Sequence, residues 1–209
     1  MRLTHPLDDI FASRSHIRIL RTLDELPDGL AVSAREVARR SGLSHPTASS
    51  VLATLKDQGV VLVHRALRAD AFELNRRHML VEKVAPLFEW ERNLLRELST
   101  FLAWQIQREA PWVSAAYLFG SAGDGDMGSG SDIDLAVVVS DPDRVKTEAA
   151  MEQVSDTVRE RFGNPLNVII GTSPIDKLRR PGRPGHRLWT RIVERGISVL
   201  DRQTLASRA

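Results

Sequence analysis

Several common stabilising and metal-binding features are missing from this sequence. It has no cysteine, which excludes disulfide bonds and zinc sites built from thiolates. Its 6 histidines are scattered and form no metal-ligand spacing such as H-x-x-x-H. No window approaches the ~18 uninterrupted apolar residues of a membrane span, and residues 1–9 contain no apolar core of a signal peptide. We therefore expect a cytoplasmic protein with no membrane partner.

A large charge of one sign is also missing. Lys and Arg number 29, and Asp and Glu number 27, which gives a net charge of only +2. Any surface that binds nucleic acid must therefore be a local patch, despite an isoelectric point of about 9.4. The 209 residues, 42% hydrophobic and 27% charged, are typical of a soluble globular protein with one large domain or two small ones.

One short motif says most about chemistry. Gly120 and Ser121 end an apolar run that fits a β-strand, and Asp132 and Asp134 open another. Side chains alternate along a strand, so the two aspartates share one face with Ile133 buried behind them. Paired carboxylates suit Mg²⁺, which keeps several waters and is completed by substrate phosphates. The glycines let backbone N–H groups approach an anion, and Ser121 adds a hydroxyl donor. The motif therefore predicts phosphoryl or nucleotidyl transfer.

The N-terminal third has the pattern of three helices and a hairpin. Apolar residues recur at three-residue intervals over 17–26, which fits a first helix. Ser33 and Glu36 form a capping box that opens a second helix. Ser44 caps a third helix, which ends at Gly59, and two β-prone segments follow.

This order of elements resembles the winged helix-turn-helix family, and its MarR-like branch in particular, over about residues 14–75. The turn and the exit of the third helix carry the resemblance: Arg39-Arg40-Ser41-Gly42-Leu43-Ser44 and Leu52-x-x-Leu55-x-x-x-Gly59-Val60-Val61. It implies an α+β domain that binds double-stranded DNA, although winged helices also serve as protein-docking modules.

The resemblance also assigns roles to particular residues. Base edges in the major groove would be read by the start of the third helix. The candidate readers are His45, Thr47, Ser49 and Ser50. The candidate phosphate or minor-groove contacts are Arg65 and Arg68 in the wing, with Arg39, Arg40 and Lys56.

In the second half, the stretch Leu118-Phe119-Gly120-Ser121, ten residues, Asp132-Ile133-Asp134-Leu135 is similar to the signature of the DNA polymerase β-like nucleotidyltransferase superfamily. The minimal nucleotidyltransferases are the branch it resembles, over about residues 88–202. The resemblance implies an α/β fold with a mixed sheet. It makes Gly120 and Ser121 contacts to a nucleotide triphosphate, and Asp132 and Asp134 catalytic ligands of two Mg²⁺ ions.

Two departures from the family pattern leave turnover open. Family catalysts use a third carboxylate on the next strand, where this chain offers Asn167, a neutral amide that cannot act as a base. Asp124, Asp126 or Asp176 could substitute only if the fold brings them near. Asp124 also stands where family members often carry an arginine, and it would repel a triphosphate unless Mg²⁺ or a cation compensates. The candidate cations are Arg144, Lys146, Arg179 and Arg180.

Together the two halves predict a two-domain protein joined by helices. We expect a winged helix-turn-helix domain over 1–76, a linker helix over 77–87, broken at Pro86, and a nucleotidyltransferase-like α/β domain over 88–209. Homodimerisation through the tryptophan-bearing helix of residues 88–109 is left open.

The leading hypothesis is a transcriptional regulator whose second domain binds a nucleotide triphosphate with Mg²⁺. Whether that domain also transfers the nucleotidyl group is left open. One alternative is an active enzyme that modifies a toxin-like partner protein, by resemblance to minimal nucleotidyltransferase antitoxins. Another is a catalytically degenerate module for nucleotide sensing or dimerisation.

Overall fold

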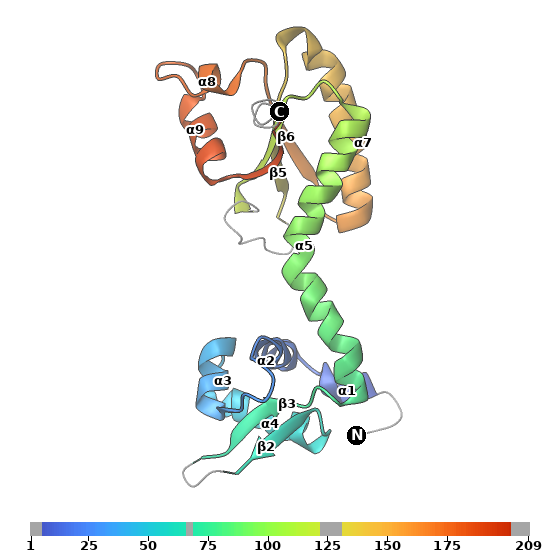
Figure 1. Ribbon diagram of the computed structural model, residues 1–209, viewed down its shortest axis with the longest axis vertical. Helices are drawn as coiled ribbons and strands as arrows, with labels where there is room; N and C mark the ends of the chain where they lie inside the picture. The colour runs from blue at the N-terminus through green and yellow to red at the C-terminus, as the bar shows by residue number, and fades with distance from the viewer. Residues whose placement is uncertain (1–5, 66–68, 122–130, 202–209) are drawn as a thin grey trace. The chain divides into compact units, whose positions relative to one another are not determined.

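The computed structural model describes residues 6–65, 69–121 and 131–201 (Figure 1). The chain divides into two compact units, Met1–Arg92 and Asn93–Ala209. The first combines helices with a small antiparallel sheet, and the second packs helices on a mixed sheet. This is the expected two-domain fold, α+β followed by α/β.

The first unit has the element order of a winged helix. Its elements are α1 (Pro6–Ile10), α2 (Arg14–Asp24), β1 (Val32–Ser33), α3 (Ala34–Ser41), α4 (His45–Asp57), β2 (Val61–His64), β3 (Ala71–Leu74) and the beginning of α5 (Met79–Glu109). Strand β3 lies between β1 and β2 and pairs antiparallel with both. Both predicted helix caps are confirmed, because the hydroxyls of Ser33 and Ser44 accept hydrogen bonds from the backbone N–H groups of Glu36 and Thr47.

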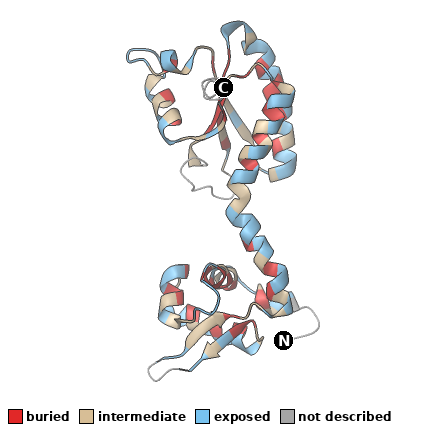
Figure 2. Ribbon diagram, viewed as in Figure 1, coloured by how far each residue is buried: buried red, intermediate tan, exposed pale blue. Residues whose placement is uncertain are grey.

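The core of this unit is formed by the buried apolar faces of its helices (Figure 2). Ile19, Leu52 and Leu55 are fully buried. The first turns of α5 join this core through Val81 and other apolar residues. The expected break at Pro86 is wrong, since this proline lies inside α5. Burial of the apolar residues around it offsets the backbone hydrogen bond that a proline cannot donate.

The second unit is built on a four-stranded sheet in the order β6-β5-β4-β7. Its elements after α5 are β4 (Ala115–Phe119), β5 (Ile133–Val138), the 3₁₀ turn η1 (Asp141–Asp143), α7 (Arg144–Phe162), β6 (Leu166–Gly171), α8 (Ile175–Leu178), α9 (His186–Arg195) and β7 (Ile197–Asp201). Strands β5 and β6 are parallel, and β4 runs antiparallel to β5 and β7, so the sheet is mixed as expected.

Each face of this sheet has its own apolar layer. Leu135 and Val137 of β5 pack in the cluster that includes residues of α5 and α7. Ala136 and Val138 point the other way and pack with Trp189 of α9 and with α8. Figure 1 shows α5 and α7 together, apart from α8 and α9. By the same alternation, the side chain of Asp134 lies on the α8–α9 face.

The buried face of α7 does not include all of its apolar residues. Val145 and Ala149 are both exposed, Val145 at 77%. Thr147 is fully buried instead, because its hydroxyl accepts a hydrogen bond from Trp112 Nε1 at 2.8 Å and donates one to Asp143 O at 2.7 Å. In the first turn of α7, a threonine that makes two hydrogen bonds therefore faces the core, and the apolar Val145 faces solvent.

Candidate functional site

Three strand ends meet where the sequence predicts the phosphate and metal site. In the sheet register, Phe119 of β4 lies opposite Asp134 of β5, and Asp134 lies opposite Asn167 of β6. Gly120 and Ser121 directly follow Phe119. The sheet therefore brings Gly120, Asp134 and Asn167 to one edge, although they are far apart in the sequence.

Asp134 is the centre of this group. Asn167 donates a hydrogen bond from Nδ2 to Asp134 Oδ1 at 2.9 Å. Gly120 has a φ of +64°, and a Cβ atom at this position would overlap Asp134 Oδ2. A glycine is therefore required here both by its backbone conformation and by the close approach of the carboxylate.

Asp132 lies at the edge of the same group. It precedes β5 and is exposed, whereas Ile133 is 1% exposed, so the predicted alternation is present. The backbone here is held by two hydrogen bonds: Ile133 N donates to Pro165 O, and Asn164 Nδ2 donates to Ser131 O, both at 2.9 Å. Asp132 is thus an accessible carboxylate on a fixed segment.

The donor set decides which metal the edge fits. Over residues 6–65, 69–121 and 131–201, no group of three or more histidine, cysteine or acidic residues is placed to hold a metal ion. Asp132 and Asp134 supply two carboxylates, which fits Mg²⁺ completed by water and phosphate oxygens. Asn167 faces Asp134 at the position where the resemblance implies a third carboxylate. Counted over the described residues alone, this set of donors fits one Mg²⁺ better than the pair of ions used by two-metal enzymes.

Of the candidate substitutes for the missing acid, the one within the described residues is not brought to this edge. Asp176 lies in α8, beyond the end of β6 opposite to Asn167. Asp124 and Asp126 lie outside the described residues.

The candidate cations lie far from the carboxylates or have partners elsewhere. Arg144 and Lys146 follow the far end of β5, about 16 Å from its start at ~3.3 Å per residue. They pair with Glu148 at 3.0 Å and Asp143 at 2.6 Å. Arg179 pairs with Glu194 at 3.4 Å. Arg180 directly follows it, just after α8.

The second candidate site is the exposed face of α4. His45, Thr47 and Ser50 are exposed and Ser49 is partly exposed. Thr47 is less free than the sequence suggests, because its hydroxyl shares a 2.7 Å hydrogen bond with Ser44 at the helix cap. The start of α4 therefore presents short polar side chains to solvent, while Ser44 binds the backbone N–H groups of Thr47 and Ala48.

Glu36 has a role that the sequence reasoning missed. Its carboxylate does not return to the helix cap but binds Arg39 at 2.6 and 2.9 Å and Arg40 at 2.6 Å. These hydrogen bonds lower the pKa of Glu36 to about 2 and raise that of Arg39. The signal was present as an acid three and four residues before two arginines. Glu36 thus orients the two cations at the turn before α4.

In the wing, Arg65 is exposed after β2, and Arg68 lies outside the described residues.

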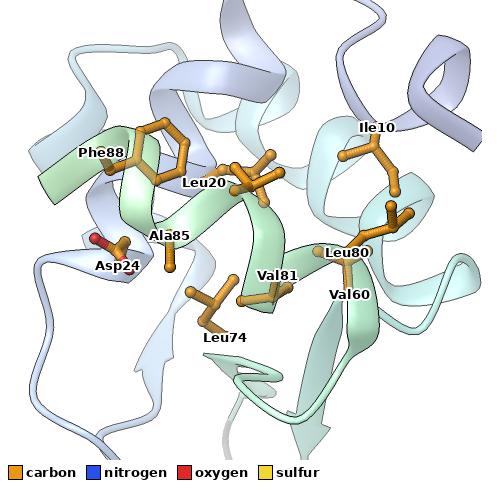
Figure 3. Close-up of a pocket in the computed structure, with 10 residues that line it drawn as sticks. Ile10, Leu20, Asp24, Val60, Leu74, Leu80, Val81, Ala85 and Phe88 are labelled. Carbon is orange, nitrogen blue, oxygen red and sulfur yellow. The ribbon is translucent and has the colours of Figure 1, made fainter. Parts of the chain in front are cut away.

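A pocket in the first unit proves to be part of the core. Figure 3 shows it between α1, α2, the hairpin and α5, with Leu20, Leu74, Val81 and Phe88 around it. Its cavity volume is about 10 Å³, roughly the smallest that holds one water. Its polar wall, Asp24, is engaged by two arginines. It is therefore too small for an organic ligand.

Two family models match the chain. A model described as MarR family matches residues 13–70, and one described as Polymerase beta, Nucleotidyltransferase matches residues 104–178. No curated protein and no solved structure matches. The two matched segments agree in order and position with the resemblances drawn from the motifs. Among the described residues, no helix has the length and apolarity needed to span a membrane.

Proposed function

We propose that this chain, which combines a MarR-like winged helix-turn-helix unit with a nucleotidyltransferase-like unit, is a cytoplasmic DNA-binding transcriptional regulator. Its second unit binds a nucleotide triphosphate with Mg²⁺. The observation that supports DNA binding is the exposed polar face at the start of α4, carried on a core that buries Leu52 and Leu55 completely. Short polar side chains on such a helix can approach base edges in the major groove.

In this proposal the residues divide into two groups. His45, Ser49 and Ser50 contact bases, while Thr47 completes the helix cap and keeps the first turn in place. The N-terminus of α4 and the arginines that Glu36 orients contact phosphates, as do Lys56 and Arg65.

Fluorescence anisotropy with labelled genomic fragments, including the gene's own promoter, tests DNA binding. We expect a fragment that binds more tightly than random duplex, and His45→Ala with Ser50→Ala should reduce that preference by ~1–3 kcal/mol per lost base contact. Lys56→Gln is the matched control, because it should weaken all duplexes alike and lower the salt slope by about 1. Equal binding of specific and random DNA at every salt concentration would refute the proposal.

The second part of the proposal concerns the edge formed by Gly120, Asp132, Asp134 and Asn167. Asp132 and Asp134 would hold Mg²⁺, which when bound supplies the positive charge that a triphosphate needs beside two carboxylates. Gly120 leaves room for the carboxylate of Asp134, and Asn167 fixes its orientation through the 2.9 Å hydrogen bond. Since the amide of Asn167 takes up no proton, these residues are better suited to hold a nucleotide than to deprotonate an attacking hydroxyl.

A second candidate function is nucleotidyl transfer to a partner protein, which the close packing of Gly120 against Asp134 favours. Incubation with labelled ATP and Mg²⁺ should then label a toxin-like partner, and Asp132→Ala with Asp134→Ala should abolish the label. Absence of label from every co-purifying protein would count against this candidate. The third reading, a degenerate sensing or dimerisation module, draws its support from Asn167.

A further inference from the structure

The positive charge of the second unit is concentrated in one segment. Residues 176–195 contain seven Lys or Arg and two Asp or Glu, although the whole chain has a net charge of only +2. Six of these cations are exposed: Lys177, Arg180, Arg183, Arg187, Arg191 and Arg195. The last three belong to α9, and we call them the α9 arginine row.

The spacing of the row is regular. Arg187, Arg191 and Arg195 are four residues apart, so they share one side of α9 and follow one another at about 6 Å along its axis. Within the described part of the chain, none of their guanidinium groups forms an ion pair or a side-chain hydrogen bond. Glu194, on the same helix, is bound to Arg179 instead. The row therefore presents three uncompensated charges.

The row runs toward the carboxylate edge. At the start of α9, Trp189 packs against Gly171, the last residue of β6. At its end, Gly196 packs against Leu118 O, two residues before Gly120. Helix α9 also covers the sheet face that carries Asp134. The arginines thus extend across this face from the far end of β6 to the edge where Asp134 lies.

The opposite side of α9 distinguishes between two negatively charged partners for the row, a lipid surface and a polynucleotide. Trp189 and Ile192 are buried against the sheet, at 5% and 1% exposure, and Leu188 and Val193 pack beside them. No apolar side of this helix remains for insertion into a lipid surface. A linear series of guanidinium groups instead suits the repeated phosphates of a polynucleotide, which they bind through paired N–H donors.

We propose that the α9 arginine row, continued by Arg180 and Arg183, is a second nucleic-acid surface that binds the phosphate backbone without reading sequence. This surface lies on the nucleotidyltransferase-like unit and does not involve α4. It goes beyond the proposed function, and it stands even if α4 recognises no operator.

The test compares two triple variants of the full chain with equal charge loss. The first variant carries Arg187→Gln, Arg191→Gln and Arg195→Gln. We expect the negative slope of the logarithm of the association constant against the logarithm of the salt concentration to decrease in magnitude by about 2 to 3. This should hold for random duplex DNA, for single-stranded RNA, or for both. The control variant carries Arg96→Gln, Arg144→Gln and Arg159→Gln, which are exposed on α5 and α7. Its slope should stay close to that of the wild type.

A third variant separates charge from folding. Replacing the three row arginines by lysine keeps the charge and should retain most of the salt slope, while circular dichroism confirms that all variants are folded. The proposal is overturned if the salt dependence of binding decreases by the same amount in the row variant and in the control variant. It is also overturned if the row variant still binds both polynucleotides like the wild type, or if anionic vesicles bind the row and DNA does not.

Discussion

At the scale of single residues, Asn167 decides what the strand ends can do. Its Nδ2 lies 2.9 Å from Asp134 Oδ1, opposite it in the parallel pairing of β5 and β6. A carboxylate at this position would repel Asp134 and require a cation, whereas the amide stabilises Asp134 without one. The hydrogen bond from Asn167 therefore stabilises the strand ends around Asp134 without a bound cation.

Replacing Asn167 with Asp should therefore make the site depend on Mg²⁺. Without metal the two facing carboxylates repel, so we expect a lower Tm than in the wild type, and addition of Mg²⁺ should restore it. If the edge can transfer a nucleotide at all, a recovered base would raise that rate by ~10² to 10⁴. Thermal unfolding with and without Mg²⁺ and pyrophosphate release measure the two effects. Asn167→Ala is the control, and equal responses of both variants to Mg²⁺ would contradict the account.

His16 should make stability depend on pH. Burial lowers its pKa, and Nε2 has no hydrogen-bond partner among the described residues, while Nδ1 bonds to Ser13. The unfolded chain takes up a proton near pH 6.5 that the folded chain resists. The stability from neutral His16 is therefore complete above about pH 6.5 and is lost as pH falls toward the folded pKa, by at most ~1.4 kcal/mol per pH unit.

Urea unfolding at pH 7.5 and 5.5 measures the decrease in the free energy of unfolding. This decrease should be smaller in His16→Gln than in the wild type. Glu36, with its pKa near 2, does not titrate in this range. An unchanged pH dependence in His16→Gln would show that another group is responsible.

At the scale of elements, Asp24 links the end of α2 through ion pairs to the segment after β3 and to α5. Its side chain is 3% exposed and binds Arg76 at 3.1 Å and Arg92, on α5, at 2.8 Å. The bond to Asp24 raises the pKa of Arg92. Arg76 also donates to the backbone oxygens of Asp24 and Leu26, so one guanidinium closes the end of the helix. These contacts place the first turns of α5 in the first unit.

Removing the charge of Asp24 should be costly. In Asp24→Asn both arginines lose a buried partner, and we expect a loss of about 3 kcal/mol, the lower end for a broken buried ion pair, because both arginines remain partly exposed. Glu91→Gln is the matched control, since it cuts the exposed pair with Arg21 and should cost less than about 1 kcal/mol. Chemical unfolding measures the free energy of unfolding of both variants. Equal losses in the two variants would show that the burial of Asp24 does not make its ion pairs more stabilising than an exposed pair.

Local signals in the sequence predicted element ends well and helix faces less well. Ser33 and Ser44 act as caps because capping needs only a hydroxyl and the next turn of the same helix. Pro86 does not break α5, because it is tolerated through a core formed by residues distant in sequence. Thr147 rather than Val145 is buried in the first turn of α7, where it is bound by Trp112 from the turn between α5 and β4. Contacts between segments far apart in sequence could not be derived from periodicity.

At the scale of the whole molecule, the two units were predictable from their motifs. The strand alternation of Asp132 and Asp134 followed from the sequence pattern, and the identity of Asn167 as the facing residue followed from the resemblance to the nucleotidyltransferases. The bond between Asn167 and Asp134, the tight approach of Gly120 and the separation of Arg144 from the carboxylates required the sheet register. Roles in DNA or nucleotide binding stay predictions, including that of Arg68, which lies outside the described residues.

The central claim is that the strand ends form a Mg²⁺-dependent nucleotide-binding site. Titration calorimetry of the full chain with ATP, GTP and CTP, with and without Mg²⁺, tests it most directly when the same samples are assayed for pyrophosphate. We predict one nucleotide bound per chain only with Mg²⁺, loss of binding in Asp132→Asn with Asp134→Asn, and no pyrophosphate released. Absence of binding by all three nucleotides, or binding that survives this double substitution, would contradict the claim.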